Sequence, residues 1–493
     1  MKHYFLLIRI FIVYVIILAV FYKCRHRSTP KAEINTITIY VDSVLNNISH
    51  HPIGINLDYF MDDDNYLKPP RSTTEALKAM GVKYLRYPGG DKSDSYLFSI
   101  PPYEKSAPTI TRIGKGCIDG REYVLNDDYA TFNRDILDFD EFITLCHDIE
   151  AEPVLVVAAD SYLKEYPDNC ELTSRDQLIE HAAAWVRYAN IHKKYNVKYW
   201  MIGNECWHKN NENSTAEIYA RDVIDFSKAM KAIDPSIYII PNGNSIEFFK
   251  EVITIAGDYI DHLCLSNYPI YGYKAEYATY RDTLQDLMHP VKRALTAIDR
   301  YATRTQKEKW KLIIAEYGPF DWGGNWPMIN DMGHSLCNFE MTGKQLQVPE
   351  IEFSQFWNTR WIYNDSIQNS VYDALDKHGN FNAIGYTMMI WGNFLGDQMV
   401  RSTSSTHVRS FASFVPEEQR LIVYLMNMLG SSQSISLDLN GYTIESVIQA
   451  WELIGDGPDD VDPIWQKIDK LDNLSGFELK GTSISVIELQ IEK

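Results

Sequence analysis

Over most of its length, the chain alternates short apolar runs rich in Val, Ile, Leu and aromatic residues with amphipathic stretches. Strands that are covered on both faces have continuous apolar sequences, and their alternation with helices is typical of a parallel sheet. Eight runs of this kind predict an α/β fold in which the sheet closes into a (β/α)8 TIM barrel. They are residues 52–58, 82–87, 153–159, 197–203, 237–241, 262–266, 310–315 and 384–391.

The stretches between these runs have apolar residues at three- and four-residue spacing, which predicts helices that pack one face on the barrel. These helices are expected at 73–80, 136–149, 175–195, 216–232, 246–256 and 284–301. Segments 88–131 and 317–350 are longer than ordinary strand-to-helix connections. Such loops stand at the C-terminal face of a barrel, so we expect them to shape a substrate site.

After about residue 397 the helical period stops and an alternation of apolar and polar residues begins. It predicts antiparallel strands at 421–426, 434–439, 446–451 and 483–491, and the early run 34–41 has the same alternation. We therefore predict four parts: an N-terminal signal anchor and linker (1–31), a strand given to a β-sandwich (32–50), a catalytic barrel (51–396) and a C-terminal β-sandwich (397–493).

The N-terminal segment is apolar from residue 5 to residue 22 except for Arg9, which is close to the shortest length that spans a bilayer. No small-x-small cleavage site follows it, which favours an uncleaved signal anchor and a membrane association. The basic residues Lys23, Arg25 and Arg27 would by themselves hold the body of the chain in the cytoplasm.

Four Asn-X-Ser/Thr sequons instead suit a glycoprotein whose body lies in the lumen or outside the cell. They begin at Asn47, Asn213, Asn364 and Asn473. We expect a protein of the secretory pathway that is membrane-anchored or extracellular.

The composition argues against several partners. A formal net charge of −19 opposes binding to nucleic acid, because phosphate contacts need clustered Lys and Arg. The seven cysteines include no CxxC pair, which disfavours a structural zinc site. We expect no metal and no organic cofactor, and the sequence does not indicate an oligomeric state.

Two glutamates directly follow predicted barrel strands. Glu205 comes after the run 198–204, and Glu316 comes after 311–315. Retaining glycosidases need one carboxyl group as nucleophile and one as acid/base. A single glutamate at a strand end equally well caps the next helix, but two on strands four and seven would face each other across the barrel mouth. Asn204 is expected to bind a sugar hydroxyl beside the reacting carbon.

Three motifs resemble those of the clan A glycoside hydrolases over roughly residues 50–490. WMIGNE at 200–205 resembles the strand-four motif of the acid/base, and IIAEYG at 313–318 resembles the strand-seven motif of the nucleophile. LRYPGG at 85–90 is similar to the strand-two motif of the α-L-arabinofuranosidase branch and its heparanase-like and agarase-like relatives. The resemblance implies that Glu205 is the acid/base and Glu316 the nucleophile.

The same resemblance implies roles for residues that bind the substrate or its carboxylates. Arg86 would orient Glu316 and hold it ionised, and Tyr268 would donate a hydrogen bond to it. Ser266 stands where many clan members have His. Trp391, at the end of the predicted eighth strand, would form a platform below the sugar or else pack in the core. Trp322 and Trp326, in the loop after the nucleophile, are further candidates for stacking against sugars.

These features predict a retaining glycoside hydrolase that acts on a polysaccharide or glycoconjugate by double displacement. Arabinofuranosidase, uronic-acid-releasing and agarase- or xylosidase-like activities all fit the motifs. An inactive, membrane-anchored carbohydrate-binding protein on the same fold is the alternative from another class. A metal enzyme would have to use the cysteines and histidines at Cys206, His208, His334 and Cys337, whose spacing matches no known ligand pattern.

Overall fold

The computed structural model describes most of the chain after the N-terminal segment. The described residues are 34–59, 61–99, 103, 111–112, 114–115, 135–163, 171–172, 174–207, 214–270, 276–283, 285–360, 370–469, 471 and 474–493. The apolar segment 5–22 and the sequons at Asn213, Asn364 and Asn473 lie outside these residues. Within the described part, no helix is both long and apolar enough to cross a bilayer.

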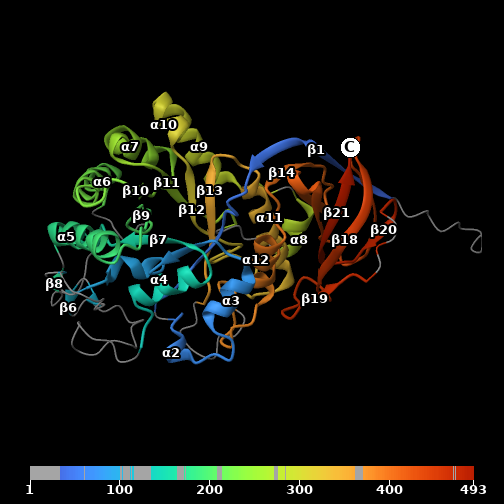
Figure 1. Ribbon diagram of the computed structural model, residues 1–493, viewed down its shortest axis with the longest axis horizontal. Helices are drawn as coiled ribbons and strands as arrows, with labels where there is room; N and C mark the ends of the chain where they lie inside the picture. The colour runs from blue at the N-terminus through green and yellow to red at the C-terminus, as the bar shows by residue number, and fades with distance from the viewer. Residues whose placement is uncertain are drawn as a thin grey trace, which may run out of the picture.

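The first domain is an eight-stranded parallel barrel surrounded by helices (Figure 1). Its strands are β2 (Ile53–Asn56), β3 (Tyr84–Tyr87), β7 (Glu152–Val157), β9 (Tyr199–Ile202), β10 (Tyr238–Pro241), β11 (Leu263–Asn267), β12 (Leu312–Tyr317) and β13 (Ile351–Phe356). Hydrogen bonds join neighbours in the order β10-β9-β7-β3-β2-β13-β12-β11. A parallel bridge between Asn242 and Cys264 closes the ring between β10 and β11. The predicted (β/α)8 barrel is confirmed.

Most of the outer helices begin at a capping residue whose side chain accepts from the first turn, whereas α8, α9 and α12 have no side-chain cap. Ser72 and Ser174, for example, each accept a hydrogen bond from a backbone N–H in the first turn. The helices are α2 (Asp64–Leu67), α3 (Thr73–Met80), α4 (Phe139–Asp148), α5 (Arg175–Val186), α6 (Ala216–Lys231), α7 (Ile246–Ala256), α8 (Tyr277–Asp282), α9 (His289–Tyr301), α10 (Arg304–Lys309), α11 (Met332–Leu346) and α12 (Ala383–Asn393).

One of the eight strand predictions is wrong. Residues 384–391 lie in helix α12, and the eighth strand is β13 (Ile351–Phe356), which pairs with β12 and β2. Helix α12 is buried at nearly every position, so it shows no polar face and its sequence looks like that of a covered strand. The other seven strand predictions coincide with barrel strands.

The second domain is a mostly antiparallel sheet that wraps around its own core and forms a β-sandwich. Its order is β19-β18-β21-β16-β15-β14-β1-β17-β20. The strands are β1 (Asn35–Asn47), β14 (Gln398–Ser402), β15 (Val408–Val415), β16 (Arg420–Asn427), β17 (Gln433–Asp438), β18 (Thr443–Ile454), β19 (Ile464–Lys467), β20 (Phe477–Leu479) and β21 (Ser483–Glu492). Two short pairs, β4 (Tyr96–Leu97) with β5 (Thr111–Arg112) and β6 (Gly114–Lys115) with β8 (Glu171–Leu172), lie outside both sheets.

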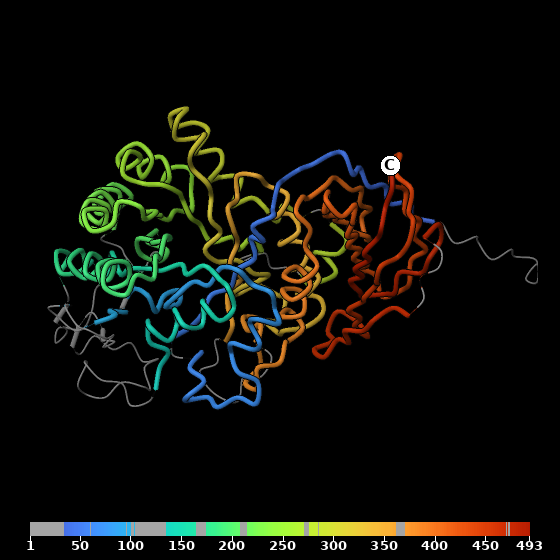
Figure 2. Tube along the Cα trace, viewed as in Figure 1, coloured from blue at the N-terminus to red at the C-terminus, as the bar shows by residue number. Residues whose placement is uncertain are grey.

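Strand β1 ties the start of the described chain to its end. It pairs with β14 antiparallel and with β17 parallel, so the early alternating run supplies a strand to the C-terminal sheet. Ile37, Ile39 and Val41 of this strand are buried in the sandwich core. In Figure 2 the blue trace leaves this sheet and enters the barrel.

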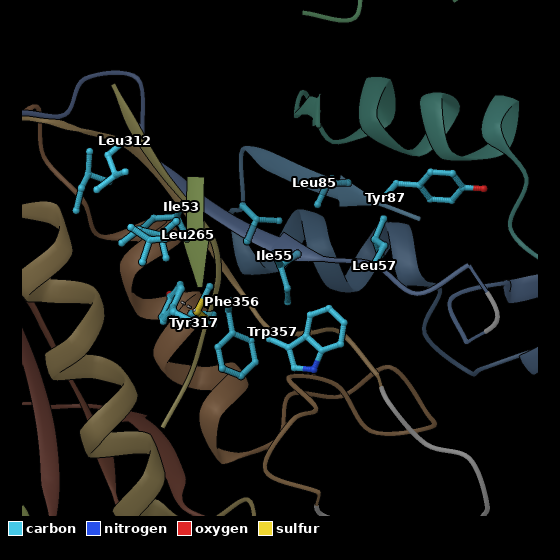
Figure 3. Packing of buried hydrophobic residues seen from close by; sticks show 14 of the residues in the cluster. Ile53, Ile55, Leu57, Leu85, Tyr87, Leu265, Leu312, Tyr317, Phe356 and Trp357 are labelled. Carbon is cyan, nitrogen blue, oxygen red and sulfur yellow. Dashed lines mark hydrogen bonds between the residues drawn. The ribbon is translucent and has the colours of Figure 1, made fainter. Parts of the chain in front are cut away.

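The barrel and the sandwich share a buried boundary. The main apolar cluster includes Ile53 and Leu312 of barrel strands and also Tyr424 and Val486 of sandwich strands. Figure 3 shows part of this cluster, with Trp357 beside Phe356 at the end of β13. The backbone N–H of Met332, at the start of α11, also donates to the carbonyl of Asp460 at 2.7 Å.

Candidate active site

Glu205 and Glu316 lie at the same mouth of the barrel. Glu205 follows strand β9, in a turn where Gly203 has φ of 70° and Glu205 itself has φ of 43°. Glu316 is the next-to-last residue of β12, and β12 lies three strands away from β9 around the closed barrel. A left-handed backbone at a non-glycine residue is uncommon and is found where the surrounding structure holds it. Here it places Glu205 near enough to Glu316 for the charge of Glu316 to raise the pKa of Glu205.

Arg86, on β3, connects the two halves of the site. Its Nη1 donates to Glu316 Oε1 at 2.8 Å and to Asn56 Oδ1 at 2.7 Å, while its Nη2 donates to Asn204 Oδ1 at 2.7 Å. The guanidinium is 2% exposed, so these charge-assisted bonds are formed out of water. The arginine therefore fixes both the nucleophile candidate and the asparagine next to the acid/base candidate.

Tyr268 holds the other oxygen of Glu316. Its hydroxyl donates to Glu316 Oε2 at 2.8 Å, so each carboxylate oxygen of Glu316 accepts one strong hydrogen bond. Trp322 packs edge-on against the Tyr268 ring, with 4.8 Å between centroids. Its indole N–H donates to the hydroxyl of Tyr372. Trp322 thus packs behind Tyr268, between this tyrosine and Tyr372.

Glu205 and Glu316 differ in how strongly neighbouring groups stabilise the ionised carboxylate. Burial, followed by the nearby charge of Glu316, raises the pKa of Glu205 to about 8. Burial also raises the pKa of Glu316, but the positive charge of Arg86 and the hydrogen bonds from Tyr268 and Arg86 act in the opposite direction. The sequence-based expectation of a low pKa for Glu316 omitted this burial. Arg86 and Tyr268 thus favour the ionised form of Glu316, whereas the charge of Glu316 favours the protonated form of Glu205.

Ser266 occupies the position between the two glutamates. It is the neighbour of Glu316 in the pairing of β11 with β12, beside a bulge that shifts the register after Leu265. Its side chain is hydrogen-bonded to Glu205, an interaction that lowers the pKa of this carboxyl group and partly offsets burial. A small hydroxyl side chain therefore serves here as the contact of the acid/base candidate.

Asn56, Trp357 and Asp91 belong to the site, and the sequence analysis did not select any of them. Asn56 ends the first barrel strand and accepts from Arg86. A methyl group added at Gly90 would lie 2.5 Å from the Trp357 ring and 2.9 Å from Glu316 Oε1, so the three residues meet. A polar residue at the end of a buried run was the available signal for Asn56. Trp357 was missed because its strand was assigned to other residues.

The predicted roles of Trp391 and Trp326 need correction. Trp391 is fully buried on α12, where it stacks on Phe339 with 4.6 Å between ring centroids and makes a tilted contact with Tyr424 of the sandwich at 4.4 Å. Its position is a domain boundary, and Trp357 is the aromatic residue beside the nucleophile candidate. Trp326 is also buried, with its ring 4.1 Å from that of His334 on α11. Neither indole is available to a sugar.

The residues of the metal-enzyme alternative do not come together. Cys206 is buried beside Glu205, whereas His334 and Cys337 are buried on α11, and His334 Nδ1 is 2.8 Å from Asp331. His208 lies outside the described residues. In the part of the chain that the structure describes, no group of three or more His, Cys, Asp or Glu side chains is arranged to hold a metal ion.

Comparison with known proteins gives a partial match in sequence and a full match in fold. Residues 76–288 match the Alpha-L-arabinofuranosidase 1 domain. Alpha-L-arabinofuranosidase C of Emericella nidulans is 28% identical over 200 residues, which cover 36% of this chain and 33% of the fungal protein. An intracellular exo-alpha-(1->5)-L-arabinofuranosidase of Acetivibrio thermocellus is 25% identical over 254 residues, 47% of this chain and 44% of that protein. The alignments thus span less than half the length of these curated relatives.

Two solved structures are similar over nearly the whole chain. Alpha-L-arabinofuranosidase from Thermotoga maritima, in an arabinose complex, superposes with a TM-score of 0.68 at 19% identity and covers 92% of this chain and 99% of its own. A Paenibacillus polymyxa xyloglucanase from glycoside hydrolase family 44 gives 0.61 at 12% identity, with 93% and 100% covered. At these identities the likeness establishes a barrel followed by a β-sandwich.

Proposed function

We propose that this chain, whose barrel, sandwich and strand-end motifs are those of the clan A glycoside hydrolases, is a retaining glycosidase that releases arabinofuranosyl groups. The observation that carries the proposal is the bridge from Glu316 through Arg86 to Asn204, beside Glu205, whose pKa is raised to about 8 by burial and by the charge of Glu316. The arabinofuranosyl group is favoured because the matched domain and the named relatives are arabinofuranosidases.

In the first step, Glu316 attacks the anomeric carbon while the bond from this carbon to the leaving oxygen breaks. Glu205 gives its proton to that oxygen, and a covalent glycosyl-enzyme forms on Glu316. Arg86 and Tyr268 hold Glu316 so that one oxygen is aimed at the carbon. In the second step, Glu205 takes a proton from water, the resulting hydroxide attacks the same carbon, and Glu316 leaves. Two inversions retain the anomeric configuration.

The charges around the site favour a neutral sugar over a uronic acid. Among the described residues that reach the site, both cationic side chains already pair with carboxylates. Arg86 pairs with Glu316, and Lys92 pairs with Asp58 at the end of β2. A uronate would add a further negative charge beside Glu316, and within the described part of the site each cationic side chain already has a carboxylate partner. This charge pattern supports the arabinofuranosidase over the heparanase-like alternative.

The test is hydrolysis of aryl glycosides with α-L-arabinofuranosyl, β-D-xylosyl, β-D-glucuronyl and β-D-galactosyl groups. We expect turnover of the arabinofuranoside with retention, observed by proton NMR of the first-formed product. Glu316→Ala is expected to lose the activity and to regain part of it with azide, which replaces the missing nucleophile and gives the inverted glycosyl azide. Glu152→Ala, an exposed glutamate at the opposite end of the barrel, is the matched control.

The pH dependence gives a second readout of the same proposal. Since Glu205 must be protonated to assist the leaving group, kcat/KM is expected to fall as the pH rises through about 8. Hydrolysis of the glucuronide instead of the arabinofuranoside would contradict the sugar class alone. If none of the aryl glycosides is hydrolysed, and neither arabinan nor arabinoxylan is, the carbohydrate-binding alternative would be favoured.

We also infer that the chain enters the secretory pathway. The apolar segment 5–22 and the four sequons support this location, and the first sequon asparagine, Asn47, is exposed at the end of β1. We expect the apparent mass on a gel to fall after treatment with an amidase that removes N-linked glycans. The part of this fall that comes from Asn47 is expected to be missing in Asn47→Gln. An unchanged mass and recovery in the cytosolic fraction would contradict the inference.

A further inference from the structure

A third carboxylate stands beside the two glutamates of the site. Asp91 is the first residue of a short 3-10 helix (Asp91–Ser95) that begins directly after Gly90. Gly90 passes against Glu316 and Trp357, where a methyl group would meet both of them. The chain therefore brings Asp91 to the mouth of the barrel, and its side chain is exposed there although most of the surrounding site is buried.

Asp91 contacts the asparagine that precedes the acid/base. Asn204 Nδ2 donates to Asp91 Oδ1 at 3.3 Å, while Asn204 Oδ1 accepts from Arg86 Nη2 at 2.7 Å. A guanidinium only donates and a carboxylate only accepts. The two partners thus allow one orientation of the Asn204 amide, with its second N–H left for a ligand. A continuous chain of hydrogen bonds runs from Glu316 through Arg86 and Asn204 to Asp91.

We propose that Asp91 is a positioning residue of this active site, which fixes the Asn204 amide and places a negative charge beside the two reacting glutamates. The inference rests on the proposed glycosidase function for its kinetic consequence. Its geometric part concerns the hydrogen bonds of Asn204 alone.

The charges facing Asp91 come from several elements. Its charge acts on Glu205 after β9 and Glu316 on β12. Arg86 on β3 is linked to Asp91 through Asn204, and the adjacent Lys92 pairs with Asp58 at the end of β2. Arg86 and Lys92 are each paired with another carboxylate, Glu316 and Asp58. The negative charge raises the pKa of Glu205 and that of Glu316, which favours a protonated acid/base before substrate binds.

Two variants separate the charge from the hydrogen bond. Asp91→Asn keeps an oxygen that accepts from Asn204 but removes the charge. We therefore expect the basic limb of kcat/KM to move down by about half a pH unit, the size of the effect of one nearby charge acting through water. The kcat at the optimum is expected to change less than about threefold. Asp91→Ala also frees the Asn204 amide, so its KM is expected to rise at every pH.

The control is Asp459→Asn, which removes the same net charge from an exposed loop of the sandwich. It is expected to leave the pH profile unchanged. A profile of Asp91→Asn that superimposes on the wild-type profile would overturn the inference, while the glycosidase function would stand.

A readout without turnover keeps the two proposals distinguishable. Carboxyl carbon NMR of protein labelled with ¹³C-glutamate, with Glu205→Gln for assignment, measures the titration of Glu205 directly. We expect its midpoint to be lower in Asp91→Asn than in the wild type. If no glycoside is hydrolysed but this difference is present, the proposed function fails and the positioning role of Asp91 remains; an equal midpoint would refute that role.

Discussion

At the residue scale, the site depends on side chains that are held in a single orientation by their hydrogen-bond partners. Arg86 donates to Asn56, Asn204 and Glu316 while almost fully buried, and Tyr268 supplies the second bond to Glu316. Preorganisation of this kind lowers the reorganisation that a reaction requires, because the groups do not have to move when charge develops. Substitutions here are therefore expected to affect rate more than stability.

Tyr268→Phe tests the bond to Glu316 Oε2. We expect kcat to fall about ten- to hundredfold, because one hydrogen bond to a charged group contributes about 1.5–3 kcal/mol. The ring and its edge contact with Trp322 remain, so the melting temperature is expected to change little. Steady-state kinetics and calorimetry on the same preparation measure both. An unchanged kcat would mean that Arg86 alone orients the nucleophile.

Glu205→Gln tests the cost of keeping a carboxyl group in this environment. The folded protein raises the pKa of Glu205 from 4.5 to about 8, so the favourable contribution of its protonated form is complete below pH 4.5 and is lost as the pH rises to 8. Glutamine does not ionise. The variant is therefore expected to exceed the wild type in melting temperature by a margin that grows between pH 5 and pH 8, as calorimetry would show. Glu152→Gln, at an exposed position, is expected to show no such trend.

At the element scale, close approach between helices α3 and α12 holds one side of the barrel. Gly392 of α12 faces the end of α3, and a methyl group there would lie 2.1 Å from the carbonyl oxygen of Met80. Gly81, which caps α3 with φ of 77°, meets the same glycine from the other side. The packing thus requires glycine at a helical position where propensity alone favours alanine.

Gly392→Ala tests whether helix propensity, which favours alanine, or the close approach of α3 and α12, which requires glycine, has the larger effect on stability. Helix propensity would stabilise the variant by about 1 kcal/mol, whereas a backbone clash at this distance forces the helices apart. We expect a net loss in the free energy of unfolding, measured with urea. Gly430→Ala, where an added methyl group meets nothing within 4 Å, is the control for glycine replacement. A stabilised Gly392→Ala would show that α12 moves away without loss.

At the scale of the whole molecule, a buried ion pair joins the barrel to the sandwich. Arg409 of β15 donates to Glu340 Oε1 of α11 at 3.1 Å, and the hydroxyl of Tyr280 donates to Glu340 Oε2 at 2.8 Å. The side chains of Arg409 and Glu340 are 6% and 4% exposed. Because this ion pair and the apolar cluster both span the boundary, we expect the two domains to unfold as one cooperative unit.

Glu340→Ala is expected to destabilise the protein by about 3–5 kcal/mol, because Arg409 would stay buried without its carboxylate. The variant and the wild type are both expected to unfold in a single calorimetric transition. Glu445→Ala removes an exposed glutamate from β18 and serves as the control. Two separate transitions in the variant would mean that the domains fold independently and that the ion pair does no more than join them.

The local sequence contained enough information for most barrel strands and for the residues at their ends. An apolar run of five to seven residues is readable without a structure, and Glu205 and Glu316 were selected because they follow such runs. Arg86 and Tyr268 were selected from the resemblance to the clan A motifs. Helix α12 defeated the same reasoning. A helix buried on nearly every side lacks the polar face that gives the 3.6-residue period. Because residues 384–391 were assigned as the eighth strand in place of β13, Trp357, which directly follows β13, was not selected.

The amino-acid sequence by itself determined the alternation of strands and helices, and with it the ring of strand ends at which the chemistry is placed. Only the tertiary structure decided which of those side chains touch. Arg86 meets Asn204 118 residues away and Glu316 230 residues away, and Asp91 joins them through Asn204. Periodicity is a local property of the chain, whereas these contacts exist because the parallel sheet closes on itself and brings distant strand ends to one mouth.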